Sequence, residues 1–162
     1  MRYSIIILFI LLSGLQVSSQ NTLAILSSQL TASCKNDREK VSAIFRWITE
    51  NISYKITPRN RTRIMGKSSH LFSKYEDGIT EDTGALKPLN ERVAIEVLKR
   101  KEAVCDGYAR LFSTLCSYTG IQSEIIVGYA RSNENKPGLK FGVNHYWNAV
   151  YFEGGWHLLD AT

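Results

Sequence analysis

Three residues in the second half of this 162-residue chain could together carry out nucleophilic chemistry: Cys105, His145 and Asp160, in that order. A thiol becomes an effective nucleophile when a base takes its proton, and that base works best when a third group orients it. Each residue also has a plainer interpretation. Cys105 could be a core cysteine, half of a disulfide or a zinc ligand, His145 a structural histidine and Asp160 a strand-end cap. Which interpretation is right depends on the helices and strands that position these residues.

Cys105 lies at the start of a predicted helix, residues 105–119. Apolar and small side chains recur there at spacings of three and four, which predicts one buried stripe: Ala109, Phe112, Leu115, Cys116 and Thr119. Gly120 suits the position after the helix, and Cys105 falls in the first turn, off the stripe. A helix N-terminus favours a thiolate and can lower the pKa of a cysteine, so the position of Cys105 suits a nucleophile, although many cysteines at helix starts are inert. We also expect its backbone N–H to hold an oxyanion; the sequence does not place a second donor.

His145 and Asp160 lie on two predicted strands that form a hairpin. With a two-residue loop at 153–154, or with a four-residue loop, Asp160 pairs with Trp147 and lies diagonal to His145 on the same face. Diagonal neighbours are about 7 Å apart, which is within reach of these side chains. A three-residue loop would move Asp160 to the opposite face. His157 has the opposite parity from Asp160, so we expect it to face away from the site.

The remaining pattern predicts an α+β fold, with helices first and an antiparallel sheet after them. Helices are expected at 22–33, at 37–52 with Asp37 as the N-cap, and from Asn90; strands are expected at 121–130, 144–152 and 156–161. The polar segment 57–90 is the least structured part, and so long a connection is typical of a functional or mobile loop. We interpret His70, within it, as a surface histidine.

The N-terminus has the pattern of a secretory signal peptide, residues 1–19, followed by one domain at 20–162. Arg2 precedes an apolar run at 5–12 that is too short to span a membrane. We therefore expect a secreted or periplasmic protein without stable membrane insertion, and an uncleaved anchor is the alternative. The net charge of +5 is modest. The basic cluster at 59–67 lacks stacking aromatic residues, which favours a solvated loop over nucleic-acid binding.

The other cysteines, Cys34 and Cys116, could form a disulfide in an exported chain. Two buried free thiols are the interpretation we favour, because cysteine packs as a small apolar residue. Three cysteines without a close pair give no structural zinc pattern, although a zinc site formed by the three candidate residues remains a weaker alternative.

Three stretches of sequence resemble the transglutaminase-like superfamily: "AVCDGYARLFSTLCSYTGIQSEIIVGYA", "NHYWNAVYFEGGWHLLDAT" and, upstream, "DREKVSAIFRWITENISYK". The last resembles bacterial and kyphoscoliosis-peptidase-like members. The resemblance implies a papain-like fold, in which a cysteine-bearing helix packs on an antiparallel sheet. It implies Cys105 as nucleophile, His145 as general base and acid, and Asp160 as the group that orients the imidazole. Matching positions make Trp147 and Tyr108 candidate substrate-binding residues, although each could instead pack.

The resemblance implies a thiol-dependent acyl-transfer enzyme that acts on peptide or protein amide bonds. Hydrolysis by a cysteine peptidase or amidase is the favoured reaction, because no run of acidic oxygen ligands marks a calcium site. A protein-glutamine transamidase and a non-catalytic binding or scaffold domain are the alternatives. We expect no cofactor, no metal and a peptide or protein as partner. Family members usually continue beyond the Asp160 strand, so we expect a truncated protein or a fragment of a longer one.

Overall fold

The computed structural model describes residues 19–55, 87–130 and 143–162. The elements are α1 (Ser19–Thr31), α2 (Asp37–Asn51), β1 (Ser53–Tyr54), α4 (Leu89–Arg100), β2 (Glu102–Ala103), α5 (Cys105–Tyr118), β3 (Ser123–Gly128), β4 (His145–Phe152) and β5 (Gly155–Leu159). Residues 1–18 of the predicted signal peptide (1–19), most of the polar segment, His70 and the basic cluster lie outside the described residues. The predicted order of helices followed by an antiparallel sheet is confirmed.

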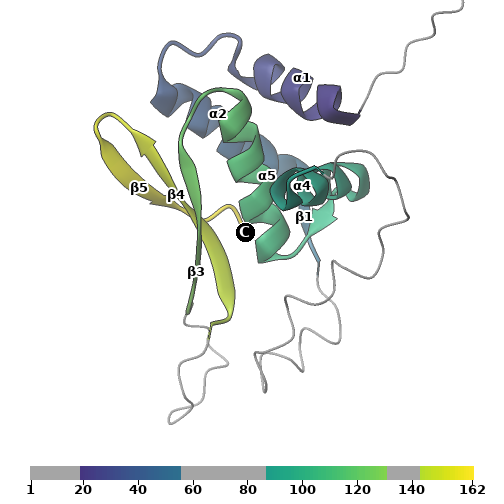
Figure 1. Ribbon diagram of the computed structural model, residues 1–162. Coiled ribbons are helices and arrows are strands. Elements are labelled where there is room, and N and C mark those ends of the chain that lie inside the picture. The colour runs from purple at the N-terminus through teal and green to yellow at the C-terminus, as the bar shows by residue number, and fades with distance from the viewer. Residues whose placement is uncertain (1–18, 56–86, 131–142) are drawn as a thin grey trace, which may run out of the picture.

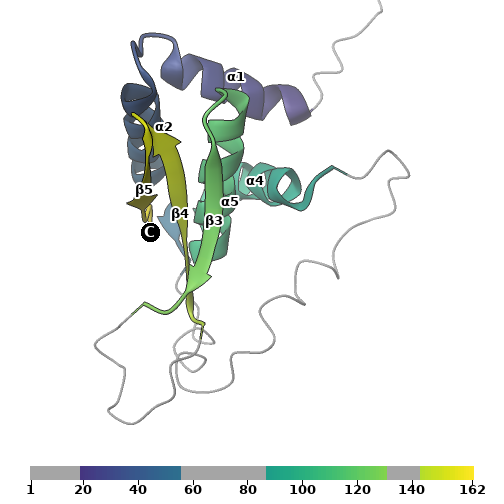
Figure 2. The same ribbon diagram turned by 60° about the vertical axis from the view of Figure 1, so that its left-hand side comes forward.

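Helix α5 lies at the centre of the fold, with the sheet on one side and the other helices around it (Figure 1). Figure 2 shows α1 crossing one end of α5 while α4 packs beside it. The α5 stripe is fully buried at Phe112, Leu115 and Cys116, as its spacing predicts. Ser27 of α1 donates a hydrogen bond to the Leu115 carbonyl at 2.7 Å, so this buried hydroxyl has a partner in the core.

Close packing at the start of α5 depends on a glycine. A Cβ atom at Gly107 would lie 2.7 Å from the Cβ of Ala103 and 3.0 Å from Cγ2 of Val97. Since real Cβ atoms do not approach other carbons so closely, only glycine allows α4 and β2 to reach the first turn of α5. This contact fixes the helix end that carries Cys105.

The three-stranded sheet has the order β3-β4-β5, and both strand pairs are antiparallel. Phe152 pairs with Gly155, so the hairpin loop has two residues, as predicted. Glu153 and Gly154 have φ values of 51° and 79°, which is the geometry of the turn that matches the twist of a hairpin. Asp160 follows β5 directly, in the register that the sequence analysis predicted.

Strands β1 and β2 form a short parallel pair that the sequence analysis did not predict. Ser53 pairs with Glu102 and Tyr54 pairs with Ala103. Backbone hydrogen bonds from Ser53 N to Lys101 O at 2.9 Å and from Lys55 N to Ala103 O at 2.8 Å close the pair. Residues that follow α2 are thereby held beside the residues that lead into α5.

The predicted N-cap of α2 was wrong by one residue. Asn36, not Asp37, caps the helix, and its side chain accepts a hydrogen bond from the Glu39 backbone N–H at 2.9 Å. The Glu39 carboxylate in turn accepts from the Lys35 backbone N–H at 2.7 Å, a reciprocal arrangement of the capping-box type. Within the part of the chain that the structure describes, no helix is long and apolar enough to cross a membrane.

Candidate functional site

Cys105 is the first residue of α5, and the N-terminus of this helix has no side-chain cap. Val104 occupies the N-cap position and forms no capping hydrogen bond. The first intrahelical bond, from Tyr108 N to Val104 O, is 3.2 Å long. The backbone N–H groups of Cys105, Asp106 and Tyr146 instead interact with the Cys105 sulfur. The N-terminus of α5 therefore directs backbone N–H groups at this sulfur, and such groups favour negative charge on it.

The helix N-terminus does not lower the pKa of the Cys105 thiol below its ordinary value. Burial raises the pKa of Cys105, and the hydrogen bonds from the Tyr146 and Asp106 backbone N–H groups only partly offset it. The nearby Asp106 carboxylate raises it further. Burial outweighs the helix terminus because a half-buried sulfur loses hydration that a thiolate needs. Cys105 is therefore a thiol in the resting protein, and its use as a nucleophile requires a base.

Asp106 forms an ion pair with Arg110 on the same helix. Its carboxylate accepts a hydrogen bond from Arg110 Nε at 2.8 Å, one helical turn along α5. Arg110 also donates to the side-chain oxygen of Asn90 on α4 at 2.5 Å. Burial raises the pKa of Asp106 and Arg110 lowers it, with burial the stronger effect. The ion pair belongs to the α4–α5 contact, and it limits the negative charge beside Cys105.

His145 and Asp160 are joined by a hydrogen bond of 2.7 Å between Nε2 and Oδ2. Their hairpin therefore places them together as the predicted register required. A carboxylate can only accept, so when Asp160 is ionised the proton of this bond belongs to His145 Nε2. The neutral imidazole then has its lone pair on Nδ1. His145 immediately precedes Tyr146, whose backbone N–H reaches the Cys105 sulfur, so all three predicted residues lie in one region.

Thr162 is a partner of Asp160 that the sequence analysis missed. Oδ1 of Asp160 accepts hydrogen bonds from the Thr162 hydroxyl at 2.7 Å and from its backbone N–H at 3.1 Å. Burial alone would raise the pKa of Asp160, but the bonds from His145 and Thr162 outweigh it and lower that pKa. An aspartate followed two residues later by threonine is a pattern for this local turn, and it could have been read from the sequence.

The His145–Asp160 bond makes stability depend on pH in a defined direction. A carboxyl with a lowered folded-state pKa contributes stability that is fully present above its unfolded pKa, about 3.9. That contribution is lost as the pH falls through the lower folded value. We therefore predict that the native chain is more stable than Asp160→Asn near neutral pH, and that the difference shrinks below about pH 4. Thermal unfolding of both proteins across pH checks this. A difference that grows in acid would show that Asp160 is not stabilised as a carboxylate.

The two candidate substrate-binding residues lie in different environments. Trp147 lies beside His145, with ring centroids 5.9 Å apart, and its indole crosses Gly128, where a Cβ atom would be 2.5 Å away. Tyr108 is only 4% exposed, and its hydroxyl donates to the Ile52 carbonyl at 2.5 Å. Trp147 thus lies next to the imidazole of His145, whereas Tyr108 is buried in the core.

A buried asparagine holds the histidine strand on the cysteine helix. Asn148 is 2% exposed and donates from Nδ2 to the Ala109 carbonyl of α5 at 3.0 Å. Ala109 is one helical turn after Cys105, and Asn148 is two strand residues after Tyr146. The two contacts, at the Cys105 sulfur and at Ala109, therefore align β4 with α5 and set the position of His145.

Tyr54, which the sequence analysis did not single out, also belongs to this region. Its ring stacks on Tyr108 with centroids 6.0 Å apart, and its phenol interacts with both the thiol and the backbone of Cys105. No periodicity in the sequence could reveal this, because the contact depends on the short β1–β2 pair.

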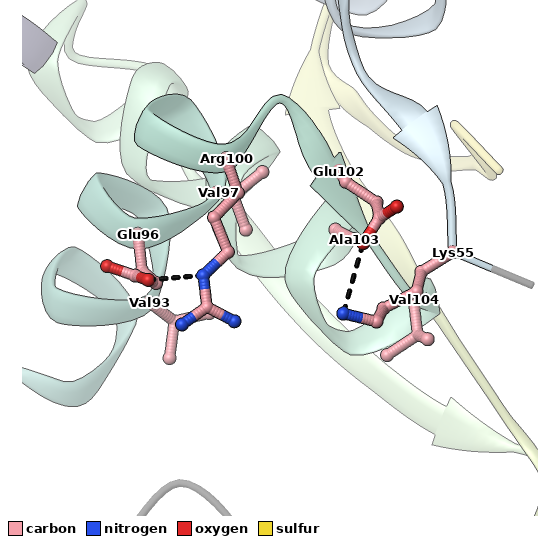
Figure 3. Close-up of a pocket in the computed structure, with 8 residues that line it drawn as sticks. All are labelled: Lys55, Val93, Glu96, Val97, Arg100, Glu102, Ala103 and Val104. Carbon is pink, nitrogen blue, oxygen red and sulfur yellow. Dashed lines mark ion pairs between the residues drawn. The ribbon is translucent and has the colours of Figure 1, made fainter. Parts of the chain in front are cut away.

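A small hollow lies next to this region, between α4 and the β1–β2 pair (Figure 3). Its volume is about 90 Å³. Val93, Val97 and Ala103 supply an apolar base, while ion pairs of Glu96 with Arg100 and of Lys55 with Glu102 lie at its rim. Cys105, His145 and Asp160 do not line it, so it is separate from the candidate site.

The alternatives for the cysteines can be compared with the structure. Cys34, Cys105 and Cys116 are free thiols, and Cys116 is fully buried while Cys34 is half-buried. No disulfide therefore joins Cys34 to Cys116. Among residues 19–55, 87–130 and 143–162, no group of three or more His, Cys, Asp or Glu side chains is arranged to hold a metal ion.

Known proteins share both the sequence pattern and the fold. Kyphoscoliosis peptidase of Mus musculus is 32% identical over 152 residues, 93% of this chain and 19% of that protein. Hillarin of Drosophila melanogaster is 31% identical over 147 residues, 88% of this chain and 14% of that protein. The chain thus spans less than a fifth of the length of either relative. The periplasmic domain of TgpA from Pseudomonas aeruginosa has the same fold, with a TM-score of 0.57 over 91% of this chain and 44% of that one, at 17% identity.

The family assignment rests on a match across the elements that carry the site. The model of the transglutaminase-like superfamily matches residues 59–161, which include α4, α5 and the sheet. The fold predicted from the resemblance is confirmed by this match and by the structural neighbour. The chain belongs to the transglutaminase-like superfamily.

Proposed function

We propose that this protein is an exported, thiol-dependent enzyme that hydrolyses peptide or protein amide bonds. Cys105 is the nucleophile, His145 the general base and acid, and Asp160 the residue that orients the imidazole. The observation that carries the proposal is the 2.7 Å bond from His145 Nε2 to Asp160 Oδ2. It leaves the lone pair of Nδ1 for the thiol proton, beside a helix N-terminus without a side-chain cap.

The proposed reaction starts with a protonated Cys105 thiol and a neutral His145 imidazole. Burial keeps Cys105 protonated, so His145 Nδ1 takes the proton as the sulfur attacks the carbonyl carbon. The C=O π electrons move to the oxygen, and the Cys105 backbone N–H donates to that oxyanion. When the oxyanion collapses, the C–N bond breaks and the imidazolium gives its proton to the leaving amine. A thioester remains, and water, activated by the same imidazole, releases the acid and restores the thiol.

Hydrolysis is preferred to amine transfer on two grounds. A relative that covers 93% of this chain is named as a peptidase, which supports amide hydrolysis as the reaction class. Within the described residues, no cluster of carboxylates provides the oxygen ligands that a calcium site requires. Trp147, next to His145, would form one wall of the acyl site. The proposed substrate is a peptide or protein, and no cofactor or nucleic acid takes part.

Export is proposed from the N-terminal sequence. Residues 1–19 combine Arg2, an apolar run and small residues before Gln20, which is the order of a signal peptide. The structural neighbour from Pseudomonas aeruginosa is a periplasmic domain, which agrees with an extracytoplasmic setting. Expression of the full chain followed by N-terminal sequencing of the secreted protein would locate the cleavage site.

A two-product assay tests the reaction. The full chain is incubated with fluorescein-labelled casein, with and without dansylcadaverine as an acceptor amine, beside Cys105→Ala and Cys34→Ala. We expect new casein N-termini with the native chain and with Cys34→Ala, none with Cys105→Ala, and little dansyl incorporation. Cys34 is the matched control because it is a half-buried thiol away from the site. Dansyl incorporation that exceeds cleavage would make the protein a transamidase. If the native chain and Cys105→Ala are equally inactive in both assays, the enzyme proposal is wrong and the scaffold alternative remains.

A further inference from the structure

A largely buried ion pair lies next to the cysteine in the first turns of α5. Asp106 directly follows Cys105, and Arg110 lies one helical turn further along. The side chains of Asp106 and Arg110 are only 15% and 13% exposed. Ion pairs at this helical spacing are usually solvated and have little effect. A pair withdrawn from water is screened less, so its charges act more strongly on neighbouring groups.

The guanidinium of Arg110 is held from two sides. Its Nε donates to Oδ1 of Asp106 at 2.8 Å, and its Nη1 donates to Oδ1 of Asn90 at 2.5 Å. Asn90 is the second residue of α4, the helix that packs beside α5. Because α4 supplies this second acceptor, the cation stays beside the first turns of α5 instead of extending into solvent.

The charges of this pair act on the groups that surround the sulfur. Burial is the main cause that raises the pKa of Cys105, and the Asp106 carboxylate raises it further. Burial also raises the pKa of Tyr146 on β4, where Asp106 adds to the effect and Arg110 opposes it. Both charges are therefore felt at the strand that carries His145, and their effects have opposite signs.

The other titratable groups that face the sulfur carry no charge at neutral pH. Tyr54 from β1 and Tyr146 from β4 both interact with it electrostatically. Burial is the main cause that raises the pKa of each phenol, so both keep their protons. His145 is neutral in the proposed resting site. The ion pair therefore supplies permanent charge beside the thiol.

We propose that Asp106 and Arg110 are positioning residues that act through the thiol, with opposed charges that set how readily Cys105 gives up its proton. Asp106 disfavours the thiolate in the resting site, and Arg110 limits this effect so that His145 can still take the proton. The inference deepens the proposed function and rests on Cys105 as its nucleophile. Since the thiolate is the reactive form, the pair restricts reactions of Cys105 that do not involve His145.

Alkylation by iodoacetamide measures the ionisation of Cys105 without a substrate. The sulfur forms a bond to the saturated carbon, iodide leaves with the bonding electrons, and the thiol proton passes to the buffer. The rate constant is followed from about pH 6 to about pH 10 in the full chain, by mass spectrometry of the peptide that contains Cys105. The proteins compared are the native chain, Asp106→Asn, Arg110→Met and the double variant. Asparagine keeps an oxygen that can accept from Arg110, and methionine keeps much of the apolar stem of arginine.

We expect the two single variants to move the midpoint of this pH profile in opposite directions. Asp106→Asn leaves the positive charge unbalanced, so the midpoint falls by about one pH unit. Alkylation near neutral pH becomes only about threefold to fivefold faster, because a more acidic thiol gives a weaker nucleophile. Arg110→Met leaves the negative charge unbalanced, so the midpoint rises and alkylation slows. The double variant has neither charge, and its midpoint lies between those of the single variants.

Glu96→Gln is the matched control. Glu96 forms an ion pair with Arg100 at the same helical spacing on α4, and it lines the small hollow that Cys105 does not line. We expect this variant to keep the native midpoint. Thermal unfolding checks that each variant is folded. If Arg110→Met does not fold, Asp106→Asn still tests the inference, because its side chain has nearly the same shape as that of the native residue.

The outcomes separate this inference from the function on which it rests. If Asp106→Asn leaves the midpoint unchanged or raises it, the pair does not set the ionisation of Cys105. If both single variants shift the midpoint in the same direction, the pair only packs α4 against α5. In either case, acetylation of native Cys105 by p-nitrophenyl acetate shows that the proposed function stands. If native Cys105 is acetylated no faster than a free model thiol, the proposed function fails, and the role of the pair in it fails as well, whatever the midpoints are.

Discussion

Replacement of Cys105 by alanine is expected to abolish amide hydrolysis, with kcat/KM reduced by about 10³-fold or more. The physical reason is that no other group near the uncapped end of α5 can form a thioester. The change removes one sulfur from a half-buried position, so the fold is expected to survive, and an unchanged thermal unfolding midpoint is the check on this. The casein assay measures the loss, with Cys34→Ala as the control that keeps full activity.

The same variant can contradict the account. If Cys105→Ala retains more than about a tenth of the native rate while remaining folded, the nucleophile lies elsewhere. Cys116 is an unsuitable control, because it is fully buried in the α5 core and its truncation would leave a cavity. Burial also raises the pKa of Cys116 to about 12, which makes this thiol inert at neutral pH.

Replacement of His145 by alanine is expected to lower kcat/KM by about 10²-fold to 10⁴-fold near neutral pH. The resting Cys105 is protonated because burial raises its pKa, so the reaction depends on a base to remove the proton. Without the imidazole, the rate has to follow ionisation of the thiol itself. We therefore expect the residual activity of His145→Ala to keep rising with pH above the ordinary range of a thiol, whereas the native activity reaches a plateau.

His157 provides a matched control for this prediction. It lies on the neighbouring strand with the opposite parity, stacks on Phe152 at a centroid distance of 3.9 Å and takes no part in the site. His157→Gln is expected to leave both the rate and the pH profile unchanged. Equal losses in His145→Ala and His157→Gln would mean that the strand, rather than the imidazole, is what the activity needs. An unchanged pH profile in His145→Ala would exclude it as the base.

The parts of the site that the sequence predicts are those governed by local periodicity. Apolar residues recur every three to four positions after Cys105, which predicts the helix, and they alternate with polar residues after Gly120, which predicts the strands. In an antiparallel hairpin, the loop length fixes which residues share a face. The pairing of His145 with Asp160 could therefore be predicted before any coordinates, and the two-residue loop at 153–154 confirmed it.

Features that depend on distant segments could not be predicted in this way. The β1–β2 pair joins Ser53 to Glu102, and α4 lies between the two strands in the sequence. Each strand has only two residues, which is too short for a detectable alternation of polar and apolar residues. The position of Tyr54 follows from that pair. The direction of the pKa shift of Cys105 also depends on distant segments. It is set by how much of the sulfur the packed fold buries rather than by the position of Cys105 in the helix.

The most direct test of the central claim is to trap the acyl-enzyme. The full native chain is mixed with p-nitrophenyl acetate, quenched in acid within the first turnover and digested for mass spectrometry. The account predicts one acetyl group in thioester linkage to Cys105, released by hydroxylamine, and none in His145→Ala at the same time point. Acetylation of another residue, or no acetyl group on Cys105 while iodoacetamide still labels it, would contradict the claim that Cys105 and His145 form a thiol acyl-transfer site.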